Sequence, residues 1–407
     1  MKCRGFAATA TLLLLLCSQA LGARHLAAQT PLPEEIETCC EALAAIGFTS
    51  ELPVFILDTL GHNVTTKGKN VDVAWCTCPM GNKAYKAQNG TAVASVHGNS
   101  SAKFAKKSFN FKTTHPDGSK DSKSLLGMPK ESKWVLYGND EADLTRGMRD
   151  FVTYNLARAS GEYATRTVWT EVFVVSDGAA LSMDDYYGLY ILEEKVDRDA
   201  DRVDIPKWTP EDPSGGYIFA FVHGDYNSGE PTTKVIERFD FPFVIKYPTP
   251  SDAANASLSE TWLTNYLSSF QAAVMADDYL TATSPSYLDF MELDTFIDFF
   301  LLTELTKSPD GYRDSIYMHK GLGQRFSMGP AWDYNEAYGE CCGFPIEGYE
   351  QNGKSAPGIA GGSAISPNGW RFLICEDRRA LPRRARRRRQ LLVPAALERH
   401  ALLRARG

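Results

Sequence analysis

Two acids lie in separate turn-rich segments on either side of a short predicted hairpin in the last third of the chain. The first segment, residues 304–315, contains Asp310, and the second, residues 329–339, contains Asp333. The residues between the segments predict two short strands joined by a glycine-rich turn. A hairpin returns the chain on itself, so we expect Asp310 and Asp333 to face one cleft.

The residue types around Asp333 indicate metal-assisted chemistry. Asn335 lies two positions after Asp333, so both side chains point to the same side of an extended segment. Carboxylate and amide oxygens bind Mg²⁺ or Ca²⁺, and Mg²⁺ usually takes only one or two protein carboxylates, with phosphates and waters completing its shell. The acids therefore suit phosphoryl transfer. The competing interpretation is that both are solvated loop residues at the ends of the hairpin.

Residues 97–111 combine a turn of small polar residues with a strand that starts at Lys106 and Lys107. Backbone N–H groups and an ammonium group can hold phosphate oxygens together. The segment is not a Walker motif, because GxxxxGK[ST] does not occur in the chain. The alternative is an ordinary hairpin with solvated lysines on an edge strand.

The first 23 residues are typical of a cleavable signal peptide. A basic start is followed by an apolar run over residues 6–17 and by small residues before a predicted cleavage after Gly22 or Ala23. The apolar run is too short to span a bilayer, and no later run is long enough. We therefore expect a secreted protein without a transmembrane segment.

Cysteines and glycosylation sequons fit this secretory expectation. Secreted chains favour disulfides, so we expect bridges that tie the N-terminal region to the segment after Asp333, with the pairing left open. A zinc site is the alternative, although the chain lacks a CxxC pair with histidines close by. The disulfide candidates are Cys39, Cys40, Cys76, Cys78, Cys341 and Cys342, and the glycosylation candidates are Asn63, Asn89, Asn99 and Asn255.

The net charge of −7 hides an asymmetry between the body of the chain and its end. Residues 378–407 contain eleven Arg against a single acid, Glu398, so the rest of the chain is more acidic than the total suggests. An acidic body argues against nucleic acid as a ligand. We interpret residues 375–407 as a low-complexity tail that arose from a frame error or an unspliced intron rather than native coding sequence. A genuine polybasic tail that binds anionic surfaces is the alternative.

Hydrophobic periodicity predicts a helical lead-in over residues 24–50, a β-rich and mostly antiparallel region over 51–255, and a more helical region over 256–374. The predicted strands cover residues 52–59, 71–76, 92–96, 107–111, 169–176, 185–196, 202–205, 215–221 and 243–247, and residues 134–136 are predicted to form a short strand or a turn. The predicted helices cover residues 144–159, 258–276 and 288–306.

The first of these helices carries apolar side chains at helical spacing after Asp143, its predicted N-cap. We expect this apolar stripe to pack on the sheet. The stripe comprises Leu144, Met148, Phe151, Val152, Leu156 and Ala159.

Four motifs, in order along the chain, resemble the successive signatures of the CotH spore-coat kinase family, and the resemblance covers roughly residues 50–374. They are His97-Gly-Asn-Ser-Ser with Lys106-Lys107-Ser-Phe, Tyr187-Gly-Leu-Tyr-Ile-Leu-Glu-Glu-Lys195 with Arg202-Val, Glu304-Leu-Thr-Lys-Ser-Pro-Asp-Gly-Tyr-Arg, and Gly329-Pro-Ala-Trp-Asp333-Tyr-Asn-Glu-Ala-Tyr-Gly.

Members of that family resemble distant protein kinases and transfer the γ-phosphate of ATP to Ser or Thr of secreted or coat proteins. The resemblance implies an α+β, atypical protein-kinase-like fold over residues 51–374, with a β-rich N-terminal lobe, a more helical C-terminal lobe and the active site between them. The implied cofactors are ATP and Mg²⁺ or Mn²⁺, and the implied partner is a secreted or surface protein substrate.

The resemblance also implies roles for individual residues. Asp310 would be the catalytic-loop acid that orients or deprotonates the attacking hydroxyl, Asp333 the Mg²⁺ ligand, and Asn335 a neighbour of the metal or its waters. The implied nucleotide-binding residues are Lys107, Lys106, Glu194 and Lys195. Two alternatives remain from other classes: a non-catalytic secreted surface, coat or adhesion protein that uses the same fold, and an acidic Ca²⁺-binding domain.

Overall fold

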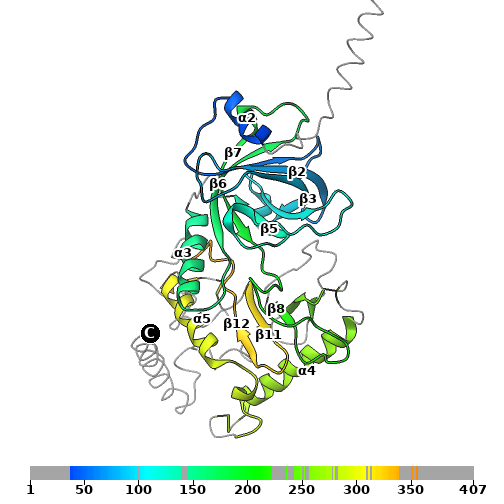
Figure 1. Ribbon diagram of the computed structural model, residues 1–407. Coiled ribbons are helices and arrows are strands. Elements are labelled where there is room, and N and C mark those ends of the chain that lie inside the picture. Colours follow the sequence, from blue (N-terminus) through cyan, green and yellow to red (C-terminus); the bar gives the residue numbers. More distant parts are fainter. Residues whose placement is uncertain are drawn as a thin grey trace, which may run out of the picture. The chain divides into compact units, whose positions relative to one another are not determined.

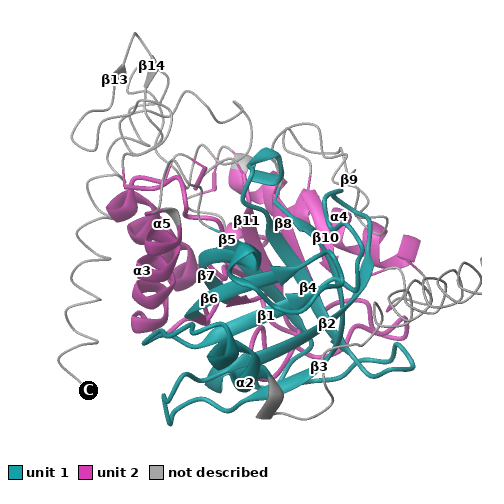
Figure 2. Cartoon of the chain, turned by 90° about the horizontal axis from the view of Figure 1, so that it is seen from above, with its two compact units in different colours: residues 1–138, 168–192 teal, residues 139–167, 193–407 magenta. Residues whose placement is uncertain are grey.

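The computed structural model describes two compact units (Figure 2). Unit 1 comprises residues 1–138 and 168–192, and unit 2 comprises residues 139–167 and 193–407. The residues described are 37–98, 101–138, 145–221, 235–236, 243–249, 252, 256–276, 278–279, 283–308, 310–311, 314–338, 350–351 and 354–355. The predicted signal peptide and the Arg-rich tail lie outside them, as do Asp143, Leu144, Cys341, Cys342, Asn99 and Asn255.

Unit 1 is built on a closed barrel of seven strands in the order β1-β2-β3-β4-β5-β7-β6. The strands are β1 (Val54–Asp58), β2 (Val71–Cys78), β3 (Gln88–His97), β4 (Ser108–Thr114), β5 (Lys133–Gly138), β6 (Thr167–Val175) and β7 (Tyr186–Glu194). Three short 3-10 turns connect them: η1 (Ser101–Lys103), η2 (Leu125–Gly127) and η3 (Met183–Asp185).

Closure of the barrel was not expected from the sequence. The successive strands from β1 to β5 pair antiparallel, as predicted, but β1 also pairs parallel with β6, with Val54 opposite Glu171. Closure removes free strand edges. Because β4 lies between β3 and β5, the strand that follows Lys107 is not an edge strand.

Aromatic side chains fill the barrel. The ring of Phe55 stacks on that of Trp75 at 5.9 Å between centroids, and Phe111 meets both rings edge-on. Gly90 lies directly opposite Trp75 on the neighbouring strand. A Cβ at Gly90 would lie 3.2 Å from the indole ring, so the glycine makes room for the tryptophan.

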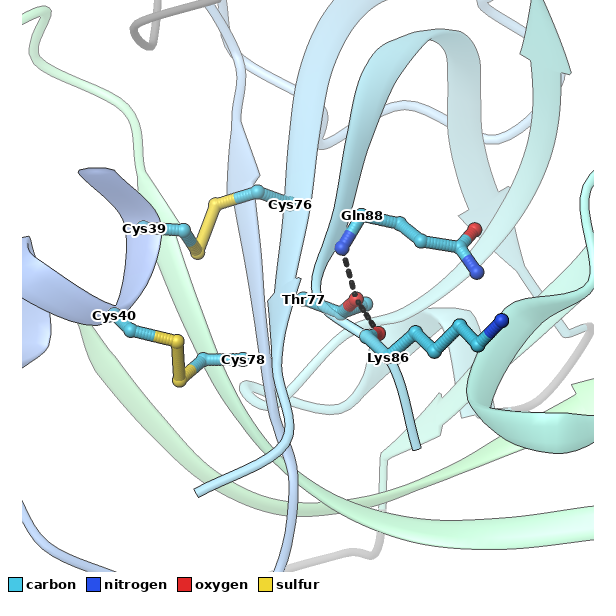
Figure 3. Close-up of a disulfide and its surroundings, with 7 residues drawn as sticks. All are labelled: Cys39, Cys40, Cys76, Thr77, Cys78, Lys86 and Gln88. Carbon is cyan, nitrogen blue, oxygen red and sulfur yellow. Dashed lines mark hydrogen bonds between the residues drawn. A yellow bond between two sulfur atoms is a disulfide. The ribbon is translucent and has the colours of Figure 1, made fainter. Parts of the chain in front are cut away.

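Two disulfides join helix α2 (Glu37–Ala45) to β2, as Figure 3 shows. Cys39 pairs with Cys76, and Cys40 pairs with Cys78. The expected bridge to the segment after Asp333 is therefore wrong for these four cysteines, which are all used within unit 1. The reason is local: alternate residues of a strand point to one face, so the two β2 cysteines both meet the helix.

Unit 2 contains a five-stranded antiparallel sheet in the order β12-β11-β8-β10-β9. The strands are β8 (Tyr217–Phe221), β9 (Val235–Ile236), β10 (Phe243–Tyr247), β11 (Ile316–Lys320) and β12 (Phe326–Met328). The remaining elements are α3 (Arg146–Ala159), α4 (Ala256–Met275), η4 (Tyr287–Asp289), α5 (Leu293–Thr306) and a two-stranded pair, β13 (Glu350–Gln351) with β14 (Lys354–Ser355).

The predicted hairpin between the two acidic segments is confirmed as β11 and β12 (Figure 1). Phe326 of β12 anchors it, because its ring contacts Phe270 of α4 at 4.9 Å and Phe296 of α5 at 5.2 Å between centroids. In contrast, the strand predicted over residues 202–205 is wrong, and only an isolated bridge between Arg198 and Val203 forms there.

The predicted α+β class is confirmed, whereas the kinase-like arrangement of two lobes around an active site stays a prediction. Unit 2 takes in α3 and the residues from 193 onward, whereas the predicted domain division at residue 256 stays a prediction. In the described part of the chain, no helix combines the length and the apolarity that crossing a bilayer requires.

Helix α3 exposes the side chains that were expected to be buried. Met148, Val152 and Leu156 are 49%, 37% and 40% exposed. The packing expectation for this stripe is therefore wrong. The buried face carries Arg149, Asp150, Thr153, Tyr154 and Ala157 instead. These side chains meet polar groups of residues 333–338, so tertiary partners rather than periodicity decide which face is covered.

Candidate functional site

Asp310 is held in a tight turn directly after α5. The helix ends with Lys307 in the left-handed region, and the N–H of Asp314 donates to the carbonyl oxygen of Asp310 at 2.9 Å. A Cβ on Gly311 would lie 2.3 Å from the Thr303 methyl group of α5, so only glycine lets the turn pack this closely. The end of α5 thus fixes the position of the turn that carries the acid.

Asp333 follows β12, and its carboxylate is oriented from both sides. The Ser315 hydroxyl donates to Oδ2 at 2.9 Å, and Nδ2 of Asn335 donates to Oδ1 at 3.2 Å. The side chains of Asp333 and Asn335 therefore meet, as expected. The backbone conformation that brings the two side chains together differs from the expectation. Asp333 is not extended but left-handed, with φ of 66°.

The environment of Asp333 disfavours its ionised form. Burial is the main cause, and the negative charges of Asp310, Asp314 and Glu336 add to it, while the hydrogen bond from Ser315 acts in the opposite direction. Together they raise the pKa of Asp333 to about 7. The influence of Asp310 also shows that the hairpin brings the two predicted acids within electrostatic reach of each other.

Two further buried acids accompany Asp333 and were missed in the sequence. Asp150 of α3 and Glu193 at the end of β7 are each only 2% exposed. Burial and then the charge of Asp333 raise the pKa of Asp150 well above its usual range, although the hydrogen bond from the Tyr334 N–H acts in the opposite direction. Burial and then the charges of Asp150 and Asp333 raise the pKa of Glu193 in the same way. Oε1 of Glu193 has no hydrogen-bond partner among the described residues.

The sequence held only weak signals for these two acids. Asp150 lies on the polar side of a helix whose apolar stripe predicted the opposite burial. Glu193 is one of two acids that end an apolar strand, and such charges usually mark the point where a strand reaches solvent. The structure instead buries both acids.

The two predicted phosphate-binding lysines belong to unit 1, whereas Asp310, Asp333 and Asn335 belong to unit 2. The Lys107 ammonium donates to the carbonyl oxygens of Ala102 and Phe104 at 2.9 and 2.6 Å. The Lys106 ammonium donates to the Leu189 carbonyl oxygen at 2.8 Å and lies 4.7 Å from the centre of the Tyr190 ring. Both ammonium groups thus have partners within their own unit.

Glu194 is the centre of a buried ion-pair network in unit 2. Its carboxylate accepts from the Arg166 guanidinium at 2.9 Å and from the Tyr163 hydroxyl at 3.2 Å, and the Arg202 guanidinium lies 3.8 Å away. Arg202 also donates to the carbonyl oxygen of Lys195 at 2.6 Å. The Glu194 side chain therefore holds the chain after β7 in place.

The predicted glycosylation candidates in the described chain differ in setting. Asn63 is exposed in the loop between β1 and β2. Asn89 lies on β3 opposite Cys76 and is partly buried. Both stay predictions, because their setting alone does not show modification.

The carboxylate of Asp333 is a candidate ligand for a divalent cation. Within the described ranges, no three Asp, Glu, His or Cys side chains form a group that could hold a metal. Mg²⁺ does not require such a cluster, since it usually binds one or two carboxylates and completes its shell with phosphate oxygens and water. A bound cation would favour the ionised form of Asp333, which its surroundings otherwise disfavour. Asp333, with the Asn335 amide beside it, could therefore hold Mg²⁺.

These features define a mixed α+β protein with an acidic site beside a hairpin. The sequence model of the family described as "CotH kinase protein" matches residues 94–381. Because this match covers most of the chain, the protein belongs to the CotH family, and the resemblance identified in the sequence is confirmed. No curated protein matches the chain.

Proposed function

We propose that this chain is a secreted, Mg²⁺-dependent protein kinase of the CotH family, which transfers the γ-phosphate of ATP to Ser or Thr of secreted or surface proteins. The observation that supports it most is that both carboxylate oxygens of Asp333 are oriented by hydrogen bonds, with Asp310 at the other end of the same hairpin close enough to raise the pKa of Asp333. Phosphoryl transfer requires mainly positioning and charge stabilisation, so a preoriented carboxylate near a second acid suits it.

In this proposal Asp333 is the metal ligand, and Asn335 lies beside the metal or its waters. Bound Mg²⁺ would supply positive charge next to the phosphate oxygens. Asp310 orients the substrate hydroxyl and accepts its proton. Hydroxyl groups of Ser and Thr are poor nucleophiles when free, which is why a positioned carboxylate is needed.

Lys107 and Lys106 are proposed to contact the nucleotide phosphates, and Glu194 with Lys195 to lie on the nucleotide side. For Lys107 this role requires its ammonium to exchange two carbonyl partners for phosphate oxygens. For Glu194 it requires a main-chain contact, because its carboxylate is used by Arg166 and Tyr163. Because Lys107 and Glu194 must meet different requirements, the proposed role of each residue can be tested separately.

Secretion is supported by the predicted signal peptide and by the two disulfides. Disulfides form and persist in oxidising compartments and are rare in the cytosol. The protein should therefore be produced in an oxidising compartment for any assay.

The deciding experiment is transfer of labelled γ-phosphate from ATP, with Mg²⁺ or Mn²⁺, to the protein itself and to a Ser-rich acceptor. Asp333→Ala should abolish transfer and leave the thermal unfolding cooperative. Asp212→Ala is the matched control, since Asp212 is an exposed loop acid of the same unit. Phosphate transfer by folded Asp333→Ala protein would rule out Asp333 as the essential metal ligand.

The alternative is a non-catalytic secreted surface, coat or adhesion protein with the same fold. The internal hydrogen bonds of the Lys107 ammonium favour it, because they leave this group already satisfied. In that case folded wild-type protein should neither bind ATP nor transfer label. Nucleotide binding measured by calorimetry separates the two functions.

A further inference from the structure

We infer that Tyr154 of α3 is a positioning residue for Asp333, and that it acts together with Asp150 by holding the backbone of the Asp333 turn. This inference rests on the proposed function, since it concerns the residue proposed there to bind the metal. It gives a role to the buried polar face of α3.

The contacts begin with two consecutive backbone N–H groups. The N–H of Asp333 donates to the Tyr154 hydroxyl oxygen at 3.1 Å, and the N–H of Tyr334 donates to Oδ1 of Asp150 at 2.8 Å. Asp150 and Tyr154 are four positions apart on α3, so their side chains lie on the same face of the helix. One face of one helix therefore binds both N–H groups.

This arrangement matters because the turn has an uncommon backbone conformation. Asp333 has φ of 66°, in the left-handed region that only a few per cent of non-glycine residues adopt, although Asp and Asn adopt it more often than the others. Such conformations persist only where surrounding contacts impose them, and they are common at functional sites. The conformation determines where the Asp333 carboxylate points, so the hydrogen bonds from α3 decide the direction of the proposed ligand.

Other residues of α3 contact the same segment on either side of Asp333, so the helix holds more of this segment than the two N–H groups. The Arg149 guanidinium donates to the carbonyl oxygen of Asn335, and the hydroxyls of Thr153 and Tyr338 lie 3.1 Å apart. In addition, the Tyr154 ring stacks on Trp332, with centroids 6.2 Å apart. Replacement of Tyr154 by Phe should keep this stacking and remove only the hydroxyl.

A purely structural role for Tyr154 makes a different prediction from a positioning role. Loss of a structural hydrogen bond lowers thermal stability but leaves the ligand geometry of the folded protein unchanged. Loss of a positioning hydrogen bond weakens cation binding although Asp333 is still present. Affinity for Mn²⁺, measured well below the unfolding temperature, therefore discriminates between them.

The test is the dissociation constant of Mn²⁺, followed by the electron paramagnetic resonance of the free ion, for wild type, Tyr154→Phe and Tyr217→Phe. Tyr217 is the matched control: it is fully buried in the same unit, stacks on Trp262, and makes two hydrogen bonds through its hydroxyl. We expect Tyr154→Phe to bind Mn²⁺ about tenfold more weakly, the effect of one lost buried hydrogen bond expressed as an affinity ratio. Tyr217→Phe should bind Mn²⁺ as the wild type does.

A second pair of variants covers the case in which Tyr154→Phe does not fold. Asp150→Ala removes the acceptor of the Tyr334 N–H, whereas Glu193→Ala removes an equally buried acid that holds neither N–H group. We expect Asp150→Ala to weaken Mn²⁺ binding more than Glu193→Ala. Equal effects would mean that the loss of any buried acid has this result, and would overturn the inference.

The outcomes separate this inference from the proposed function. If wild type binds Mn²⁺ and transfers phosphate, but folded Tyr154→Phe binds Mn²⁺ equally well, Tyr154 is structural and only the inference fails. If folded wild type binds no Mn²⁺, the proposed function fails and the inference fails with it. A selective loss in Tyr154→Phe supports both.

Discussion

The hydroxyl of Ser315 donates a hydrogen bond to Oδ2 of Asp333 at 2.9 Å, and both residues have a positive φ, of 54° and 66°. Two left-handed residues from opposite ends of the hairpin thus meet at one carboxylate. Uncommon backbone conformations at Ser315 and Asp333 persist only where contacts impose them. We therefore expect this hydrogen bond to hold the Asp333 carboxylate in its orientation.

Ser315→Ala should weaken the site without unfolding the protein. The substitution removes a donor that lowers the pKa of Asp333, so the pKa should rise above its wild-type value of about 7. Stability should fall by about 1 kcal/mol, as for one partly buried hydrogen bond. The pH dependence of phosphate transfer should therefore shift to higher pH. An unchanged profile in active Ser315→Ala protein would contradict the assigned role of the hydrogen bond.

Divalent cations should stabilise the protein more at high pH than at low pH. The pKa of Asp333 is raised from 3.8 to about 7 on folding, so the folded state holds a proton that the unfolded state has released between these values. The stability contributed by this group is therefore complete below about pH 4 and is lost as the pH rises to about 7.

A cation that binds ionised Asp333 offsets this loss, and at low pH it must first displace the proton. The shift of the unfolding temperature caused by Mg²⁺ should consequently be larger at pH 8 than at pH 5.5, as differential scanning calorimetry can measure. Identical shifts at the two pH values would argue against Asp333 as the ligand. Asp333→Asn protein serves as the control, because its side chain does not titrate.

Substitutions on α3 should follow the observed burial and not the hydrophobic pattern. Leu156 is 40% exposed, so Leu156→Gln should change the free energy of unfolding by less than about 0.5 kcal/mol. Ala157 is buried against Ala331 and Tyr334, so Ala157→Leu should overpack the site and cost about 1–3 kcal/mol. Urea unfolding of the two variants provides the comparison. The opposite order of stabilities would mean that the apolar stripe is the packed face.

Removal of either disulfide should destabilise unit 1. The bridge between Cys39 and Cys76 closes a loop with a sequence separation of 37 residues. Loss of such a native bridge typically costs about 2–4 kcal/mol. Cys39→Ala, Cys76→Ala and the double variant should therefore show the same loss, because each breaks the same bond. Peptide mapping checks the connectivity directly, and a peptide that links Cys39 to Cys341 would refute it.

Local sequence signals predicted much of the candidate site. Glycine and proline mark the turns around Asp310 and Asp333, and alternating apolar residues mark the strands between them, so the hairpin could be recognised without tertiary information. The structure also orients Asn335 toward Asp333. The left-handed backbone at Asp333 could not be predicted, because the contacts that hold it come from α3 and Ser315, far away in the sequence.

The same limit explains what was missed. Asp150 and Glu193 were unremarkable in the sequence because burial of an acid depends on what covers it. Glu194 illustrates the converse, since the resemblance implies a nucleotide-side residue where the structure shows a carboxylate paired with Arg166. A buried charged residue is stabilised by partners that lie far away in the chain. The sequence alone therefore does not reveal which partner a given charged residue has.

The sequence by itself determined the family, the order of most helices and strands, and the position of the two acids on either side of the hairpin, because these depend on motifs and on spacing over a few residues. Only the tertiary structure decided the closure of the barrel by β1 and β6, the pairing of Cys39 with Cys76, and the buried polar face of α3. Each of these features is a contact between segments far apart in the chain. Hydrophobic periodicity describes one segment at a time, and it therefore carries no information about which distant partner will cover it.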